Sequence, residues 1–152
     1  MAYTTAEGRE QVLSDLAVAV DQIADALARL GEAYEQLDEQ HADLLEDQLF
    51  RPVQSAYGRA RRTHADFAAR SGLKGRTFTP HSPGPQSQSV QELIERAAEA
   101  VQDADQSIAE LQDSMLPVEV GDPELRAGLS QVRETLDPVP ARARALVRTV
   151  GR

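Results

Sequence analysis

The sequence predicts an all-α protein, an elongated antiparallel helical bundle with four main helices in a single domain covering residues 1–152. Ala and Leu, two strong helix formers, occur 23 and 16 times. Aromatic residues make up only 4% of the chain, which argues against a sandwich, a barrel or a doubly wound sheet. The larger apolar side chains recur in four segments at alternating spacings of three and four residues, a narrow stripe typical of bundle helices.

The first segment, residues 4–50, predicts one long helix. Its stripe consists of Leu13, Leu16, Val20, Ile23, Leu27, Leu30, Tyr34, Leu37, His41 and Leu44. The spacing continues unchanged across Gly31, which weakens a helix by about 1 kcal/mol relative to Ala. We expect Pro52 to stop or kink this helix near Phe50, because proline lacks a backbone donor and disfavours a helical residue before it. Whether the chain reverses there or only kinks stays open.

A second helix is expected from Pro52 to Ser71, with Gly72 as the residue that ends it. Residues 73–88 follow with three prolines, two glycines and no periodicity. This composition predicts a mobile, protease-sensitive crossover between the second and third helices.

The third helix is expected to begin at a capping box formed by Ser89 and Glu92, and Pro117 ends it. The fourth helix begins at Asp122-Pro123-Glu124, which supplies an N-cap, a first-turn proline and a first-turn acid. Two further prolines, Pro138 and Pro140, predict a short break within it.

Charge alternates along the chain between acidic and basic segments. Residues 10–50 hold eleven acids and one arginine, and residues 51–76 hold seven bases and one acid. The third segment is acidic and the fourth is basic, which suits an antiparallel packing of each basic helix against acidic neighbours. The net charge of −9 argues against binding to nucleic acid or to anionic membranes.

The absence of cysteine excludes disulfides, thiolate zinc sites and cysteine nucleophiles. The N-terminus does not resemble a signal peptide, and the apolar runs are far shorter than a membrane span. We therefore expect a soluble, cytoplasmic protein.

The basic segment is the candidate ligand-binding site. Its candidate residues are Arg51, Tyr57, Arg61, Arg62, His64, Lys74 and Arg76. Arginine beside an aromatic ring suits a phosphate, a carboxylate or an acidic partner helix. The alternative is that these bases neutralise the acidic first and third helices.

Two histidines, His41 and His64, occupy positions on the apolar stripes. They could meet to bind a metal or haem if the chain reverses at Pro52, but they would lie about 35 Å apart if the helix continues. Asp38 and His41 have the acid-x-x-His spacing of di-iron bundles, but Arg61 stands where His64 would need its acid. No third ligand is evident, so no metal or cofactor is expected, and a buried structural histidine is the alternative.

No catalytic motif is present, so we do not expect an enzyme. The leading hypothesis is a non-enzymatic interaction or scaffold module that acts through helix packing and self-association. We expect self-association, most simply as a dimer, because a second helix that folds back from Pro52 covers only the C-terminal half of the first and leaves its N-terminal stripe bare. The competing outcome is a monomer in which the third and fourth helices cover that stripe. The alternatives are an anion- or small-ligand-binding bundle that uses residues 51–76, and a metal- or haem-binding bundle that uses His41 and His64.

Overall fold

The computed structural model describes residues 5–84 and 88–150, and every regular element within them is helical. The elements are α1 (Thr5–Gln36), α2 (Glu39–Leu45), a π-helical turn η1 (Glu46–Phe50), α3 (Arg51–Arg70), α4 (Val90–Asp113), the short α5 (Leu116–Glu119), α6 (Pro123–Leu136) and α7 (Val139–Val150). The predicted all-α class is confirmed.

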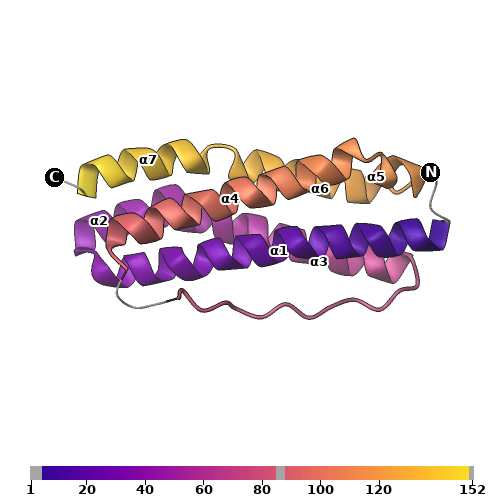
Figure 1. Ribbon diagram of the computed structural model, residues 1–152, viewed down its shortest axis with the longest axis horizontal. Helices are drawn as coiled ribbons and strands as arrows, with labels where there is room; N and C mark the ends of the chain where they lie inside the picture. The colour runs from indigo at the N-terminus through magenta and orange to yellow at the C-terminus, as the bar shows by residue number, and fades with distance from the viewer. Residues whose placement is uncertain (1–4, 85–87, 151–152) are drawn as a thin grey trace.

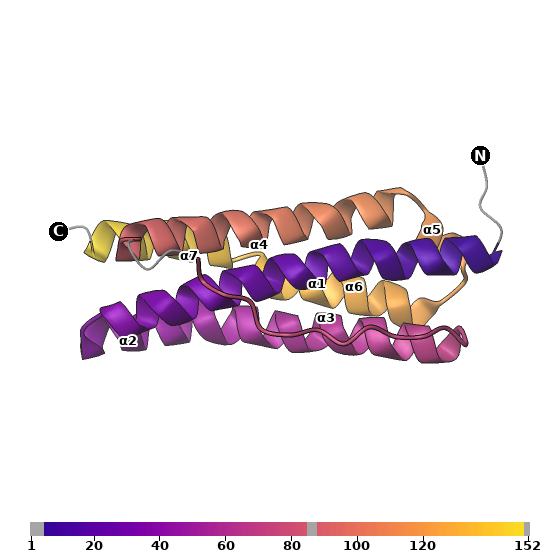
Figure 2. The same ribbon diagram turned by 60° about the horizontal axis from the view of Figure 1, so that its bottom comes forward.

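The helices form four rods, which are α1, the continuous α2–η1–α3, α4, and α6–α7 (Figure 1). The α1 rod packs against α3 and α4, while α6 packs on α3 and α7 packs on α4. Each rod runs antiparallel to the rods beside it, and the connection from α3 to α4 runs back along the bundle (Figures 1 and 2). The predicted elongated antiparallel bundle, with a crossover between its second and third main helices, is therefore confirmed.

The chain reverses at Leu37 and Asp38, so the prediction of one helix over residues 4–50 is wrong. Asp38 has an extended backbone (φ −67°, ψ 165°), and its carboxylate accepts a hydrogen bond from the His41 amide at 3.0 Å. It is therefore the N-cap of α2. The apolar stripe keeps its spacing through this reversal, which is why periodicity alone did not reveal it. Gly31 lies within α1, as predicted.

The helix continues through Pro52, so the chain neither stops nor reverses there. The irregularity expected near Phe50 takes the form of a π-helical turn at residues 46–50. In an α-helix the proline ring would clash with the carbonyl four residues earlier, which belongs to Gln48. Residues 46–50 form a wider π-helical turn in which the Arg51 amide bonds to the Glu46 carbonyl. The Gln48 carbonyl accepts a hydrogen bond from Arg142 Nη1 of α7 at 3.3 Å.

The remaining predicted boundaries agree with the structure. Gly72 follows α3 with a φ of +68°, and Ser89 and Glu92 form the capping box of α4. Asp122 caps α6, and a break separates α6 from α7 at Pro138. The third helix ends at Asp113, slightly earlier than expected.

The N-terminal half of α1 is covered within the same chain, mainly by α4. Leu16, Val20 and Ile23 are fully buried, and Leu13 is 8% exposed. The uncovered stripe that motivated the predicted dimer is therefore not a feature of this fold.

Residues 73–84, which we call the strap, lie along the surface beside α1 and α3 (Figure 2). Phe78 meets the buried His64 ring edge-on at 5.1 Å between centroids. Arg76 lies 4.6 Å from the centre of the Phe78 ring and forms an ion pair with Asp21 of α1 at 2.9 Å. Of the predicted mobile linker 73–88, residues 85–87 lie outside the described residues. Limited proteolysis tests its mobility, and the contacts of the strap favour resistance.

Candidate binding sites

The seven candidate residues of the basic segment do not converge on one site. Arg51 lies beside Glu46 (3.7 Å) and Asp47 (3.9 Å). Tyr57 and Arg61 share a groove with the strap, and Arg62 faces α6. His64 is buried under Phe78, and Lys74 and Arg76 belong to the strap itself. The helix and the strap therefore present these side chains to several surfaces.

Tyr57 and Arg61 line a cavity of about 290 Å³, which we call the strap groove. Its lining residues are Ala24, Leu27 and Ala28 from α1, Gln54, Tyr57 and Arg61 from α3, and Pro80 and His81 from the strap. The Arg61 guanidinium lies 4.6 Å from the centre of the Tyr57 ring, a cation–π contact that holds the charge in place. None of the described lining residues is acidic.

His41 and His64 lie on the same helical rod, 23 residues apart in sequence, which separates them by about 35 Å. His41 Nδ1 contacts the Asp38 carboxylate at 2.7 Å. No group of three or more His, Asp or Glu side chains within residues 5–84 and 88–150 could hold a metal ion. The metal or haem hypothesis therefore lacks the geometry that it requires.

His64 is a buried histidine with an unpaired ring nitrogen. It is 2% exposed, and its Nδ1 has no hydrogen-bond partner among the described residues. Burial lowers the pKa of His64, and the positive charge of Arg76 lowers it further, while a hydrogen bond to the Leu13 backbone acts in the opposite direction. His64 is therefore neutral at neutral pH and packs as part of the core.

Arg70 joins α3 to the start of α6. It donates two hydrogen bonds to Asp122, at 2.8 and 2.9 Å, and one to Glu124 at 3.0 Å. The hydrogen bond from Arg70 is the main cause that lowers the pKa of Asp122, and the Leu125 amide, which Asp122 caps, acts in the same direction. Arg70 thus pairs with acids at the start of the fourth predicted helix, and not with the acidic first or third helix that the alternative named.

We predict that Asp122→Ala lowers the free energy of unfolding at pH 7 by about 1–2 kcal/mol, because it removes a helix cap and an ion pair. A lowered folded-state pKa means that this stabilisation is present above the unfolded-state value and is lost as the pH falls through the folded-state value. Denaturant titrations from pH 7 to pH 3 should show the two proteins converging in stability. A constant difference across that range would contradict this role of the charged carboxylate.

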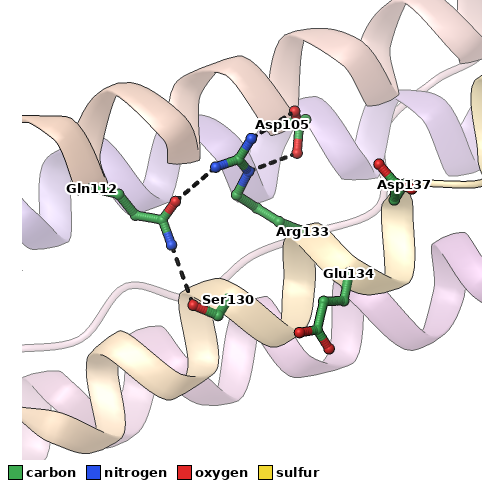
Figure 3. Close-up of a pocket in the computed structure, with 6 residues that line it drawn as sticks. All are labelled: Asp105, Gln112, Ser130, Arg133, Glu134 and Asp137. Atoms are coloured by element: carbon green, nitrogen blue, oxygen red, sulfur yellow. Dashed lines mark hydrogen bonds and ion pairs between the residues drawn. The ribbon is translucent and has the colours of Figure 1, made fainter.

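A polar groove of about 400 Å³ lies between α4 and α6 (Figure 3). Arg133 bonds to Asp105 and to Gln112, both at 2.9 Å, and Gln112 bonds to Ser130 at 3.5 Å. These groups satisfy one another across the helix interface. The groove is therefore best explained as part of the contact between the two helices.

A smaller groove of about 250 Å³ lies where the first two rods meet at the reversal, and we call it the end groove. It is lined by Gly31, Tyr34 and Glu35 from α1 and by Glu46 and Phe50 from η1. A Cβ atom added to Gly31 would meet no described atom within 4 Å, so the missing side chain leaves open space. This groove could not be predicted from the sequence, because the predicted single helix separates Gly31 from Phe50.

The end groove lies in the most acidic part of the chain. Residues 32–47 contain seven acids and no lysine or arginine. Apolar surface is exposed at the same end of the bundle, where Tyr34 is 38% and Leu44 is 41% exposed. The end groove thus combines apolar walls with an acidic border.

Comparison with models of protein families, with curated proteins and with solved structures finds no match. Within the described residues, the helices lack the combination of length and apolar character needed to cross a membrane.

Proposed function

We propose that this protein is a non-enzymatic interaction module that binds a basic segment of another protein in the end groove. The observation that carries the proposal is the open space at Gly31. A glycine inside a helix is destabilising by about 1 kcal/mol relative to alanine, and no contact among the described residues requires it. A glycine at this position keeps the groove open for a partner, which would account for its cost in helix stability.

The chemistry of the groove selects the occupant. Tyr34 and Phe50 line the same groove as Gly31 with partly exposed aromatic rings, which suit an aliphatic side chain or the stem of a lysine or arginine. Glu35 and Glu46 border the same space; Glu46 already lies 3.7 Å from Arg51, and Glu35 has no ion-pair partner among the described residues and favours a positively charged occupant. A basic amphipathic helix, with an apolar residue between lysines or arginines, meets both requirements.

The partner is proposed to be a different protein and not a second copy of this chain. The stripe on α1 that favoured self-association is buried by α4 and α3. A second copy would also bring an equally acidic end against the acidic groove, and like charges disfavour that contact.

The test is a binding titration with a fluorescent peptide of about 15 residues that contains leucines at helical spacing among lysines and alanines. We expect saturable binding that weakens as salt rises, because exposed charges are screened. Gly31→Leu fills the groove and should weaken binding at least tenfold, while Gly58→Ala, a glycine substitution within α3, should leave binding unchanged. Thermal unfolding should show that both variants are folded.

Charge is tested separately by the double substitution Glu35→Gln and Glu46→Gln. We expect it to weaken binding and to reduce its dependence on salt, whereas Glu10→Gln with Glu110→Gln, a pair outside the groove, should do neither. Equal binding by Gly31→Leu and the unmodified protein would contradict the proposal. Absence of peptide binding, together with dimers detected by light scattering, would also contradict the proposal.

A further inference from the structure

We propose that the strap groove is a second, independent binding site, which takes a small organic anion made of a carboxylate and a compact apolar body. This inference does not rest on the end groove, which is lined by entirely different residues.

Arg61 is a positively charged side chain of the groove without an acidic partner among the described residues. In a chain of net charge −9, Arg51, Arg70 and Arg76 each lie within ion-pair distance of an acid. Like Arg59 and Arg62 of the same helix, Arg61 has no carboxylate partner within residues 5–84 and 88–150, and it differs from them by its contact with the Tyr57 ring. A guanidinium held over an aromatic ring keeps its charge and its donors available for an incoming carboxylate.

The α1 wall of the strap groove is built from small and apolar side chains. Ala24 and Ala28 stand one helical turn apart on α1, and their small side chains leave room beside Leu27. This part of the lining is apolar, and Pro80 of the strap adds to it. The volume of about 290 Å³ lies at the small end of the range for ligand pockets, which suits a ligand the size of a substituted benzene.

Polar side chains border the apolar part of the strap groove. Gln54, Tyr57 and His81 supply an amide, a hydroxyl and an imidazole. Asp21 lies 3.6 Å from His81 Nε2 and forms an ion pair with Arg76 at 2.9 Å. Among the described lining residues, Arg61 is the only arginine, lysine, aspartate or glutamate, so the charge of the lining favours an anion.

The strap completes the groove and is fastened on its N-terminal side. The contacts of Arg76 with Asp21 and of Phe78 with His64 precede Pro80 and His81 directly in sequence. These anchors hold the two lining residues against α1 and α3, so the site does not need to be assembled when the ligand arrives.

The experiment is a titration of the ¹⁵N-labelled protein with benzoate, followed by heteronuclear NMR. We expect saturable shifts at Gln54, Tyr57, Arg61 and His81, at least tenfold weaker binding of the neutral benzamide, and at least tenfold weaker binding of inorganic phosphate. Benzamide as tight as benzoate would show that charge is not recognised and would overturn the proposal. Phosphate as tight as benzoate would show a simple anion site and would overturn the assignment of an apolar body.

Variants test the assignment of residues. Arg61→Gln should weaken benzoate binding at least tenfold. Arg59 is an exposed residue of the same helix that lies outside the groove, so Arg59→Gln should leave binding unchanged. Ala28→Leu should fill the groove and block binding, and its helical circular dichroism should remain that of the unmodified protein. Equal effects of the two arginine substitutions would overturn the proposal. Loss of end-groove peptide binding without loss of benzoate binding would contradict the proposed function alone.

Discussion

Replacing Leu16 with aspartate is expected to unfold the protein, whereas the same substitution at Val18 leaves it folded. Leu16 is fully buried in the core between α1 and its neighbours, and Val18, two residues later on the same helix, is 50% exposed. A buried, unpaired carboxylate lowers the free energy of unfolding by more than about 4 kcal/mol, while an exposed substitution changes it by about 0.5 kcal/mol or less.

Circular dichroism with urea denaturation measures both effects, and light scattering on the unmodified protein accompanies it. We expect Leu16→Asp to lose its helical signal and Val18→Asp to retain it. Similar stability of the two variants would contradict the burial of this stripe within one chain. Loss of stability in Val18→Asp, together with a dimeric unmodified protein, would instead support self-association through α1.

Replacing Gly128 with alanine is expected to destabilise the bundle by about 1–3 kcal/mol through overpacking. A Cβ atom at Gly128 would lie 2.5 Å from Thr63 Oγ1 and 2.9 Å from Thr63 Cγ2. Both residues are buried where α6 crosses α3, so neither helix can move without disturbing the core. The gain in helix propensity of about 1 kcal/mol does not offset this clash.

Two controls accompany Gly128→Ala in denaturant titrations. Gly31→Ala is the same substitution at a position with open space, and it should stabilise the protein by up to about 1 kcal/mol. In a Thr63→Ala background the two shortest contacts are lost and only the contact with the Cβ atom of residue 63, at 3.2 Å, remains, so Gly128→Ala should become much less destabilising. A destabilising Gly128→Ala that is equally large with and without Thr63 would contradict this explanation.

Much of the fold could be predicted because local signals and tertiary packing agree. The capping residues Ser89 and Asp122 begin helices where they were expected, and Gly72 ends one. Prediction failed between residues 37 and 52, where local chemistry and periodicity conflict. Asp38 caps a new helix without interrupting the apolar stripe, and Pro52 is accommodated by a π-helical turn whose freed Gln48 carbonyl is satisfied by Arg142 from α7.

The candidate sites were less predictable than the fold. Tyr57 and Arg61 share a groove because residues four apart lie on one helix face, which sequence spacing does show. The path of the strap, which supplies Pro80 and His81, depends on the contacts of Phe78 and Arg76 and cannot be inferred from composition. At Gly31 the sequence predicts a local weakness of the helix, because the apolar spacing does not reveal the reversal that brings Phe50 near it.

The most direct test of the proposed function is a map of where the basic peptide binds, obtained by titrating it into the ¹⁵N-labelled protein. We expect the largest chemical-shift changes at Gly31, Tyr34 and Phe50, with little change at Arg61 or on the strap. These changes should saturate together with a single affinity. Shifts spread over all acidic surfaces, without a maximum at Gly31, would contradict the claim that the end groove is the binding site.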